Sequence, residues 1–146
     1  MTKGARGPLR VEHLLVRADR IEARIRIADG YPRYTDEALI ERCLKDFPTI
    51  GMHACRNGQG PTFAAVMNNT SIPHLLEHLV IDLQVRADND ESRVFVGTTQ
   101  WSVECDRVAC VQVSFRDDLV ALAAFKQALA SINGYLEEID SRRAGS

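Results

Sequence analysis

The sequence predicts an α+β domain in which helices pack against an antiparallel sheet. Three observations favour this fold class. Segments with strand periodicity and segments with helix periodicity are interspersed along 146 residues, a length that suits one domain with one core. Two of the β segments are separated only by a short polar turn, as in a hairpin. No internal repeat, coiled coil or low-complexity tract argues for another architecture. We therefore expect a single domain over residues 1–146, with frayed ends at about 1–8 and 141–146.

The first strand is predicted from Ile21 to Ile27. Apolar residues at its odd positions alternate with Glu22, Arg24 and Arg26, which is typical of a strand with one buried and one solvated face. Three further strands are predicted, the last two as a hairpin: Thr49–Cys55, Arg93–Val103 and Val108–Phe115. The mixed segment Leu9–Val16 has no clear period and cannot be assigned.

Capping residues predict a first helix and a final helix. A first helix is expected from Asp36 to about Phe47, with Thr35 as its cap. A final helix is expected from Asp117 or Asp118 to about Ile139, although Asn133-Gly134 is a point where it can break.

The helix between these two is the most informative. It begins after Thr70 or Ser71, tolerates Pro73 in its first turn and runs to about Val85 or Arg86. Its apolar stripe consists of Ile72, Leu75, Leu76, Leu79 and Leu83. Much of the opposite side consists of His74, Glu77, His78, Ile81 and Gln84. We expect one side to pack on the sheet and the other to face a cleft.

The run His74-Leu75-Leu76-Glu77-His78 on this helix indicates a hydrolytic zinc site. Residues four apart on a helix have Cβ atoms about 5–6 Å apart, so both imidazoles can reach one ion. A Glu directly before the second His gives the order of the inverted zinc-peptidase motif, in which Glu77 is the general base. The alternative is a helix whose imidazoles bond to neighbours while Glu77 is solvated.

A catalytic zinc ion needs a third protein ligand, and Cys55 is the first choice. It lies at the end of a predicted strand and directly before a flexible loop. His53 shares a strand face with Cys55, so that either residue can ligate while the other orients a ligand or a substrate. Three residues remain as weaker candidates: Glu104, Cys105 and Cys110. A buried free thiol is an equally good interpretation of Cys55.

Two further residues are candidate substrate contacts. Gln84 lies two turns beyond Glu77 at nearly the same azimuth, and Arg56 opens the loop after Cys55. A surface amide and an ordinary turn are the simpler interpretations. Trp101 is expected in the core.

Composition excludes several classes of function. The net charge of -2 and the lack of a basic stripe argue against nucleic acid as a partner. No apolar stretch of about 20 residues predicts a membrane span. We expect a cytoplasmic protein with four free cysteines, because no close pair and no secretion signal is present. The sequence also lacks a phosphate-binding loop, and it does not indicate an oligomeric state.

The spacing around the histidine pair resembles the N-terminal domain of cyanophycin synthetase. The matching pattern is His53-x-Cys55, Gly58, Phe63 and Thr70-x-x-x-His74-x-x-Glu77-His78-x-x-x-x-Leu83-Gln84, within a similarity from about Ile21 to Phe115. The chain departs from that pattern at Pro61-Thr62-Phe63 and at Asp82, and 97–100 lacks an arginine. The ATP-grasp and Mur-ligase-like domains of the synthetases are absent, so a stand-alone homologue is expected.

The resemblance implies both a function and a fold. In the synthetases this domain is associated with binding the aspartate-arginine polymer, and some members have a metallohydrolase-like site that clips it. The resemblance thus suggests His74 and His78 as zinc ligands, Glu77 as base and Cys55 as third ligand. The motif is also similar to that of the mitochondrial-processing-peptidase and S-ribosylhomocysteine-lyase superfold. We expect a zinc-dependent hydrolase of a peptide or isopeptide, or else a non-catalytic module that binds a polymer or protein.

Overall fold

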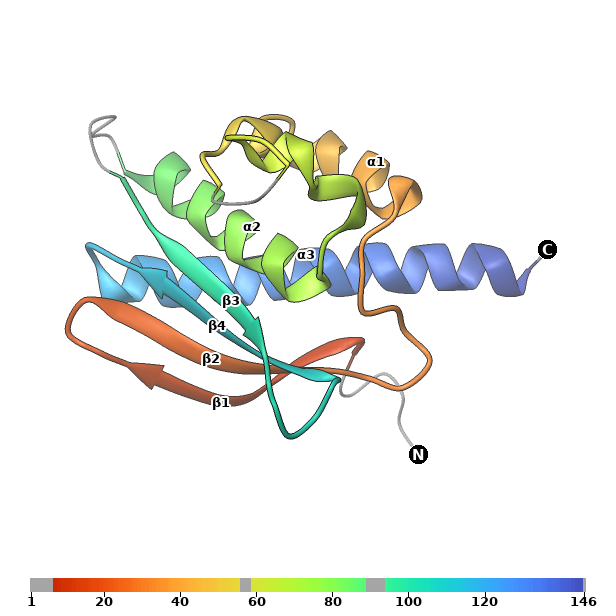
Figure 1. Cartoon of the computed structure of the whole chain (residues 1–146), viewed down its shortest axis with the longest axis horizontal. Coiled ribbons are helices and arrows are strands. Elements are labelled where there is room, and N and C mark those ends of the chain that lie inside the picture. The colour runs from red at the N-terminus through yellow and green to blue at the C-terminus, as the bar shows by residue number, and fades with distance from the viewer. Residues whose placement is uncertain (1–6, 56–58, 89–93, 146) are drawn as a thin grey trace.

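The computed structural model describes residues 7–55, 59–88 and 94–145. These residues form a four-stranded antiparallel sheet with helices on one face (Figure 1). The strands are β1 (Leu9–Val16), β2 (Arg20–Ile27), β3 (Gly97–Trp101) and β4 (Val108–Ser114). Their order across the sheet is β1-β2-β4-β3, so β1 and β3 are the two edges. The α+β class is therefore confirmed.

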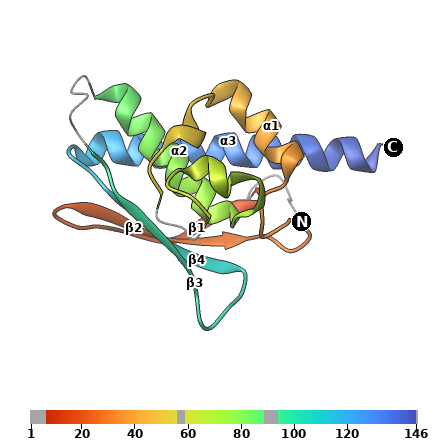
Figure 2. The ribbon, with the colours of Figure 1, turned by 45° about the horizontal axis from the view of Figure 1, so that its top comes forward.

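The helices α1 (Glu37–Asp46), α2 (Ile72–Ala87) and α3 (Asp118–Ala144) lie on the same side of the sheet (Figure 2). α2 packs on β3 and β4, whereas α3 packs on β1 and β2 and also on α2. α1 packs on α3 as a second layer. The segment between α1 and α2 contains three short 3₁₀ turns and lies against α2.

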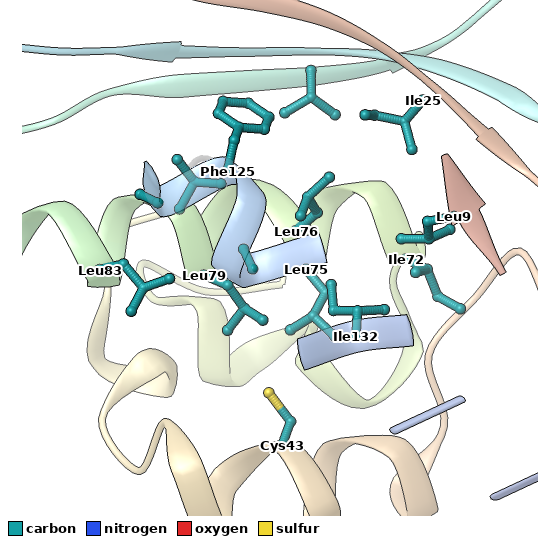
Figure 3. Packing of buried hydrophobic residues seen from close by; sticks show 14 of the residues in the cluster. Leu9, Ile25, Cys43, Ile72, Leu75, Leu76, Leu79, Leu83, Phe125 and Ile132 are labelled. Atoms are coloured by element: carbon teal, nitrogen blue, oxygen red, sulfur yellow. The ribbon is translucent and has the colours of Figure 1, made fainter. Parts of the chain in front are cut away.

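The core fills the space between the sheet and the helices (Figure 3). The predicted apolar stripe of α2 is buried there, because Ile72, Leu75, Leu76 and Leu79 are fully inaccessible. Phe125 and Ile132 of α3 meet it from the side, and Cys43 closes it from α1. Burying one such aliphatic side chain contributes about 1.5–3 kcal/mol, so this stripe fixes α2 on the sheet.

The strand predicted at Thr49–Cys55 is wrong. Ile50–Met52 form a 3₁₀ turn, and only one isolated bridge, between Ala54 and Thr62, remains. The physical reason is that Gly51 breaks the run of alternating side chains, and the segment then pairs with its own loop rather than with the sheet. The Phe63 N–H donates to the His53 carbonyl at 2.8 Å, which holds that loop closed.

The predicted cap of α1 is also wrong. Asp36 caps the helix, because its carboxylate accepts a hydrogen bond from the Leu39 N–H at 2.9 Å. Thr35 has another role. Its hydroxyl donates to the Met67 carbonyl at 2.7 Å and accepts from the Thr70 N–H at 2.9 Å, which ties the start of α1 to the segment before α2.

α3 is not interrupted at Asn133-Gly134, and it continues to Ala144, so most of the end expected to fray is helical. The Asn133 side chain bonds both main-chain groups of Leu9, at 2.7 and 3.0 Å, instead of competing for its own backbone. Leu9 begins β1, the strand that the sequence does not reveal. A register shift between Val11 and His13 breaks the period of two there.

α3 is the one helix of the described residues that is long and apolar enough to cross a membrane by length and composition. The sequence analysis expects no such span. Core helices of soluble proteins pass the same test, and α3 buries Ala121, Phe125 and Ile132 against the rest of the domain.

Candidate metal centre

α2 begins at a well-defined cap that places His74 in its first turn. The Ser71 hydroxyl accepts a hydrogen bond from the His74 N–H at 3.1 Å, so Ser71 is the cap of the two residues that the sequence offers. The polar side of the helix is covered as well as the apolar side. Glu77 and His78 are only 5% and 2% exposed, while His74 is half-buried. Burying this many polar groups costs free energy unless each of them has a hydrogen-bond or metal partner.

The structure brings Cys55, His74 and His78 together as one group of donors. Their ligand atoms all lie within 4.8 Å of one another. His74 Nε2 lies 3.2 Å from His78 Nε2 and 3.6 Å from Cys55 Sγ. A tetrahedral zinc ion with ordinary bond lengths separates two nitrogen ligands by about 3.3 Å, and a nitrogen from a sulfur ligand by about 3.6 Å. The donor types and the two separations that involve His74 therefore agree with a zinc site.

The second ring nitrogen of His78, Nδ1, takes part in a chain of contacts that orients the ring. His78 Nδ1 lies 3.2 Å from His53 Nδ1, and His53 Nε2 lies 3.3 Å from Asp82 Oδ1. The Asp82 carboxylate accepts from His53 Nε2, so the His53 ring accepts through Nδ1. His78 then donates from Nδ1 and keeps the lone pair of Nε2 for a metal.

The outer nitrogen of His74 is held by Thr70, because its Nδ1 lies 2.8 Å from Thr70 Oγ1. Its Nε2 thus points at His78 Nε2. With the Thr70 hydroxyl donating to Nδ1, the neutral His74 ring carries its proton on Nε2 and donates it to His78 Nε2. A metal ion would replace that proton.

The electrostatics of the two rings favour the metal over the proton. Burial lowers the pKa of His74, and burial together with the charges of His74 and His53 lowers the pKa of His78 to about 3. Phe63 contributes to the burial, since its ring stacks on His78 with a centroid distance of 4.0 Å. Neutral imidazoles are the form that binds zinc.

Glu77 lies between the histidine pair and β3. Its Oε2 is 3.9 Å from His78 Nε2, and its Oε1 accepts a hydrogen bond from the Thr99 hydroxyl at 2.7 Å. Burial raises the pKa of Glu77 to about 7, against the opposing effect of the Thr99 bond. The carboxyl group is thus poised to exchange a proton near neutral pH.

Gly97 makes room for this carboxyl group. A Cβ on Gly97 would lie 2.7 Å from Glu77 Cγ and 2.9 Å from the Gln112 carbonyl oxygen. The sequence analysis assigns no role to Gly97, Thr99 or Asp82. The first two follow Glu77 by about twenty positions and reach it only through the packing of β3 on α2, so local patterns carry no signal of them.

The remaining candidates lie elsewhere. The Gln84 side chain donates to the Ser114 carbonyl at 3.1 Å and lines a cavity of about 680 Å³ at the far end of α2. Glu104 and Cys105 lie in the β3–β4 turn, and Cys110 is paired with Arg24 of β2. Arg56 lies outside the described residues. Within the described part of the chain, only Cys55, His74 and His78 form such a donor group.

The fold and these side chains define an α+β domain with a candidate Cys-His-His metal centre on its central helix. A family model of the cyanophycin synthase-like N-terminal domain matches residues 21–137. The chain therefore belongs to that family, as the resemblance in its sequence suggests. No curated protein matches the chain.

Proposed function

We propose that the chain is a zinc-dependent amide hydrolase that acts on a peptide or an isopeptide. The observation that carries the proposal is the grouping of three possible zinc ligands within 4.8 Å of one another, beside a carboxyl group of raised pKa. Cys55, His74 and His78 would hold the ion, and the family membership agrees with a polymer or peptide as ligand. Burial of Glu77 and His78 matches the water-poor surroundings in which charge is stabilised best during catalysis.

A zinc ion bound there would polarise a substrate carbonyl and lower the pKa of a water molecule in its open position. Glu77 would take the proton from that water at Oε2, the oxygen nearer to His78. It would then deliver the proton to the leaving amine. Thr99 holds the other oxygen of Glu77 and so fixes the direction of Oε2. Thr70 and His53 keep the two imidazoles pointed inward.

A binding module without catalysis is the second candidate. The low exposure of Glu77 and His78, 5% and 2%, favours it because a substrate has little direct access to these two side chains. In this case the zinc ion would have a structural role, and a polymer or partner protein would bind nearby without being cleaved.

Glu77→Gln separates the two candidates. The untagged chain is loaded with zinc, its metal content is measured, and β-linked aspartyl-arginine peptides and ordinary peptides are tested as substrates. Hydrolysis by the wild type that is abolished in Glu77→Gln, with zinc retained, is the expected result. Glu104→Gln is the matched control, since Glu104 is exposed in the distant turn. Zinc loading and peptide binding without cleavage by the wild type would favour the binding module, and undiminished cleavage by Glu77→Gln would reject Glu77 as base.

A further inference from the structure

β3 is an edge strand that lies directly beside the candidate metal centre. It pairs with β4 on one side only, whereas β1 forms the opposite edge of the sheet (Figure 1). An edge strand presents main-chain N–H and C=O groups that can pair with another extended chain.

The register shows which groups of β3 face outward. The Ser102 N–H donates to the Val108 carbonyl and the Ser114 N–H donates to the Val96 carbonyl, so even-numbered residues of this strand bond to β4. Gly97, Thr99 and Trp101 occupy the alternate positions. Their main-chain groups therefore point away from β4, and in the described residues these groups have no hydrogen-bond partner.

The same three residues turn their inner faces toward the site. Thr99 bonds Glu77, and Gly97 leaves the space that Glu77 fills. Trp101 follows on the same face, where Arg33 stacks on its ring at 4.3 Å. Arg33 Nε donates to the Asp106 carbonyl at 2.6 Å and forms no ion pair with a described carboxylate, so a positive charge lies at this end of β3.

The other edge of the sheet is blocked at one end. Asn133 bonds both main-chain groups of Leu9, and a register shift interrupts the pairing of β1 with β2 between Val11 and His13. Natural sheets often block their edges in such ways. In β3, by contrast, no described side chain bonds the outward main-chain groups of Gly97, Thr99 and Trp101, so the edge beside the donors is open.

We propose that the substrate is an extended peptide main chain that docks on the free edge of β3 as a fifth strand. This inference rests on the proposed hydrolase function and names its substrate class. A docked strand lies about 4.8 Å from β3, which brings its backbone amides beside Thr99 and the Glu77 carboxyl group. An acidic residue of the peptide near the Trp101 end pairs with Arg33.

Amide hydrogen exchange tests the docking without any turnover. The probe is the capped peptide Ac-Asp-Val-Thr-Val-Asp-NH₂, added to the zinc-loaded Glu77→Gln variant, and cleavage is scored in parallel with the wild type. In the free chain the amides of Gly97, Thr99 and Trp101 exchange fast, while those of Thr98 and Gln100 are slow. The peptide is expected to slow the first set, and to leave the amides of β1 unchanged as an internal control.

Two N-methylated forms of the probe test the strand pairing itself. One is methylated at its valine nitrogens and the other at its threonine nitrogen and last aspartate nitrogen. In a docked strand every second N–H group points toward β3, so only one of the two forms loses hydrogen bonds to β3. That form should bind at least about tenfold more weakly than the parent peptide, and the other form should bind like the parent. Equal affinity of both forms would overturn the proposal.

The other outcomes are equally decisive. Slow exchange of Gly97, Thr99 and Trp101 in the free chain would show that the edge is already covered, and unchanged exchange with the peptide would show that it does not dock there. Equal protection of β1 would show that the pairing is unspecific. Each of these results overturns docking. Protection of β3 without any cleavage leaves the docking intact and rejects the hydrolase, so the two failures are distinguishable.

Discussion

The two halves of α2 contain buried polar residues of different kinds. In the C-terminal half, Gln84 is 1% and Asp82 is 4% exposed, and their partners are other groups of the protein, although the buried Asp82 Oδ2 lacks a hydrogen bond. Gln84 donates to a main-chain carbonyl, and Asp82 forms an ion pair with Arg86 at 2.9 Å. In the N-terminal half, His74 and His78 turn their Nε2 atoms toward each other at 3.2 Å beside Cys55, and these three residues could hold a metal ion.

The difference shows that burial alone does not identify a functional residue. A buried polar group whose hydrogen bonds are complete within the chain stabilises the fold and has no capacity left for a ligand. A set of donors that face one another has such a capacity. This contrast favours the N-terminal half of α2 for the candidate metal site, and Asp82 supports that half through His53.

Replacement of a ligand should have the largest effect. His74→Ala removes one of three donors, and zinc affinity should fall by more than about 100-fold, beyond the loss typical of outer partners. Competition with a chromophoric chelator measures it. An unchanged affinity would place the zinc site elsewhere and remove the contrast between the two halves.

Replacement of His53, whose ring contacts His78, should have the next largest effect on zinc affinity. His53→Phe keeps a ring but removes the acceptor for His78 Nδ1, so zinc affinity should fall by about 10–100-fold. The ¹⁵N shifts of the His78 ring should show a changed tautomer in the metal-free variant. Arg86→Ala is the matched control, since it removes the other partner of Asp82. A similar loss of zinc affinity in both variants would indicate a general loosening of the site.

Gly97→Ala should destabilise the fold at the contact between α2 and β3. Its Cβ would lie 2.7 Å from Glu77 Cγ, so the free energy of unfolding should fall by about 1–3 kcal/mol in urea titrations. Gly134→Ala is the control: apart from its chain neighbours and the backbone of its own helix, no described atom lies within 4 Å of its new Cβ, and the helix should gain about 0.5–1 kcal/mol. An equal change in the free energy of unfolding in the two variants would contradict the close packing of Gly97 against Glu77.

Gln84→Met should have the smallest effect on the site. It leaves the Ser114 carbonyl without its donor and should cost about 1–3 kcal/mol of unfolding free energy, with zinc affinity unchanged. Chelator competition on the same sample checks this separation. A substantial loss of zinc affinity would show that the two halves of α2 are coupled.

Features within a single helix could be predicted from the sequence. The cap at Ser71, the apolar stripe and the shared face of His74, Glu77 and His78 all depend on residues three or four positions apart. Their geometry follows from helix periodicity once the helix is recognised. The sequence therefore indicates the part of the site that lies on α2.

Features that depend on distant segments could not be predicted in the same way. Cys55 reaches His74 from a loop, although the strand expected to carry it does not form. Thr99 reaches Glu77 only because β3 packs under α2. β1 escaped recognition because its register shift interrupts the alternation that identifies strands.

X-ray absorption at the zinc edge tests the central claim most directly. The zinc-loaded chain should contain one equivalent of metal with two nitrogen ligands at about 2.0–2.1 Å and one sulfur ligand at about 2.3 Å, and Cys55→Ser should lose the sulfur. A sulfur-free shell in the wild type, or an identical shell in Cys55→Ser, would contradict the assignment of this site.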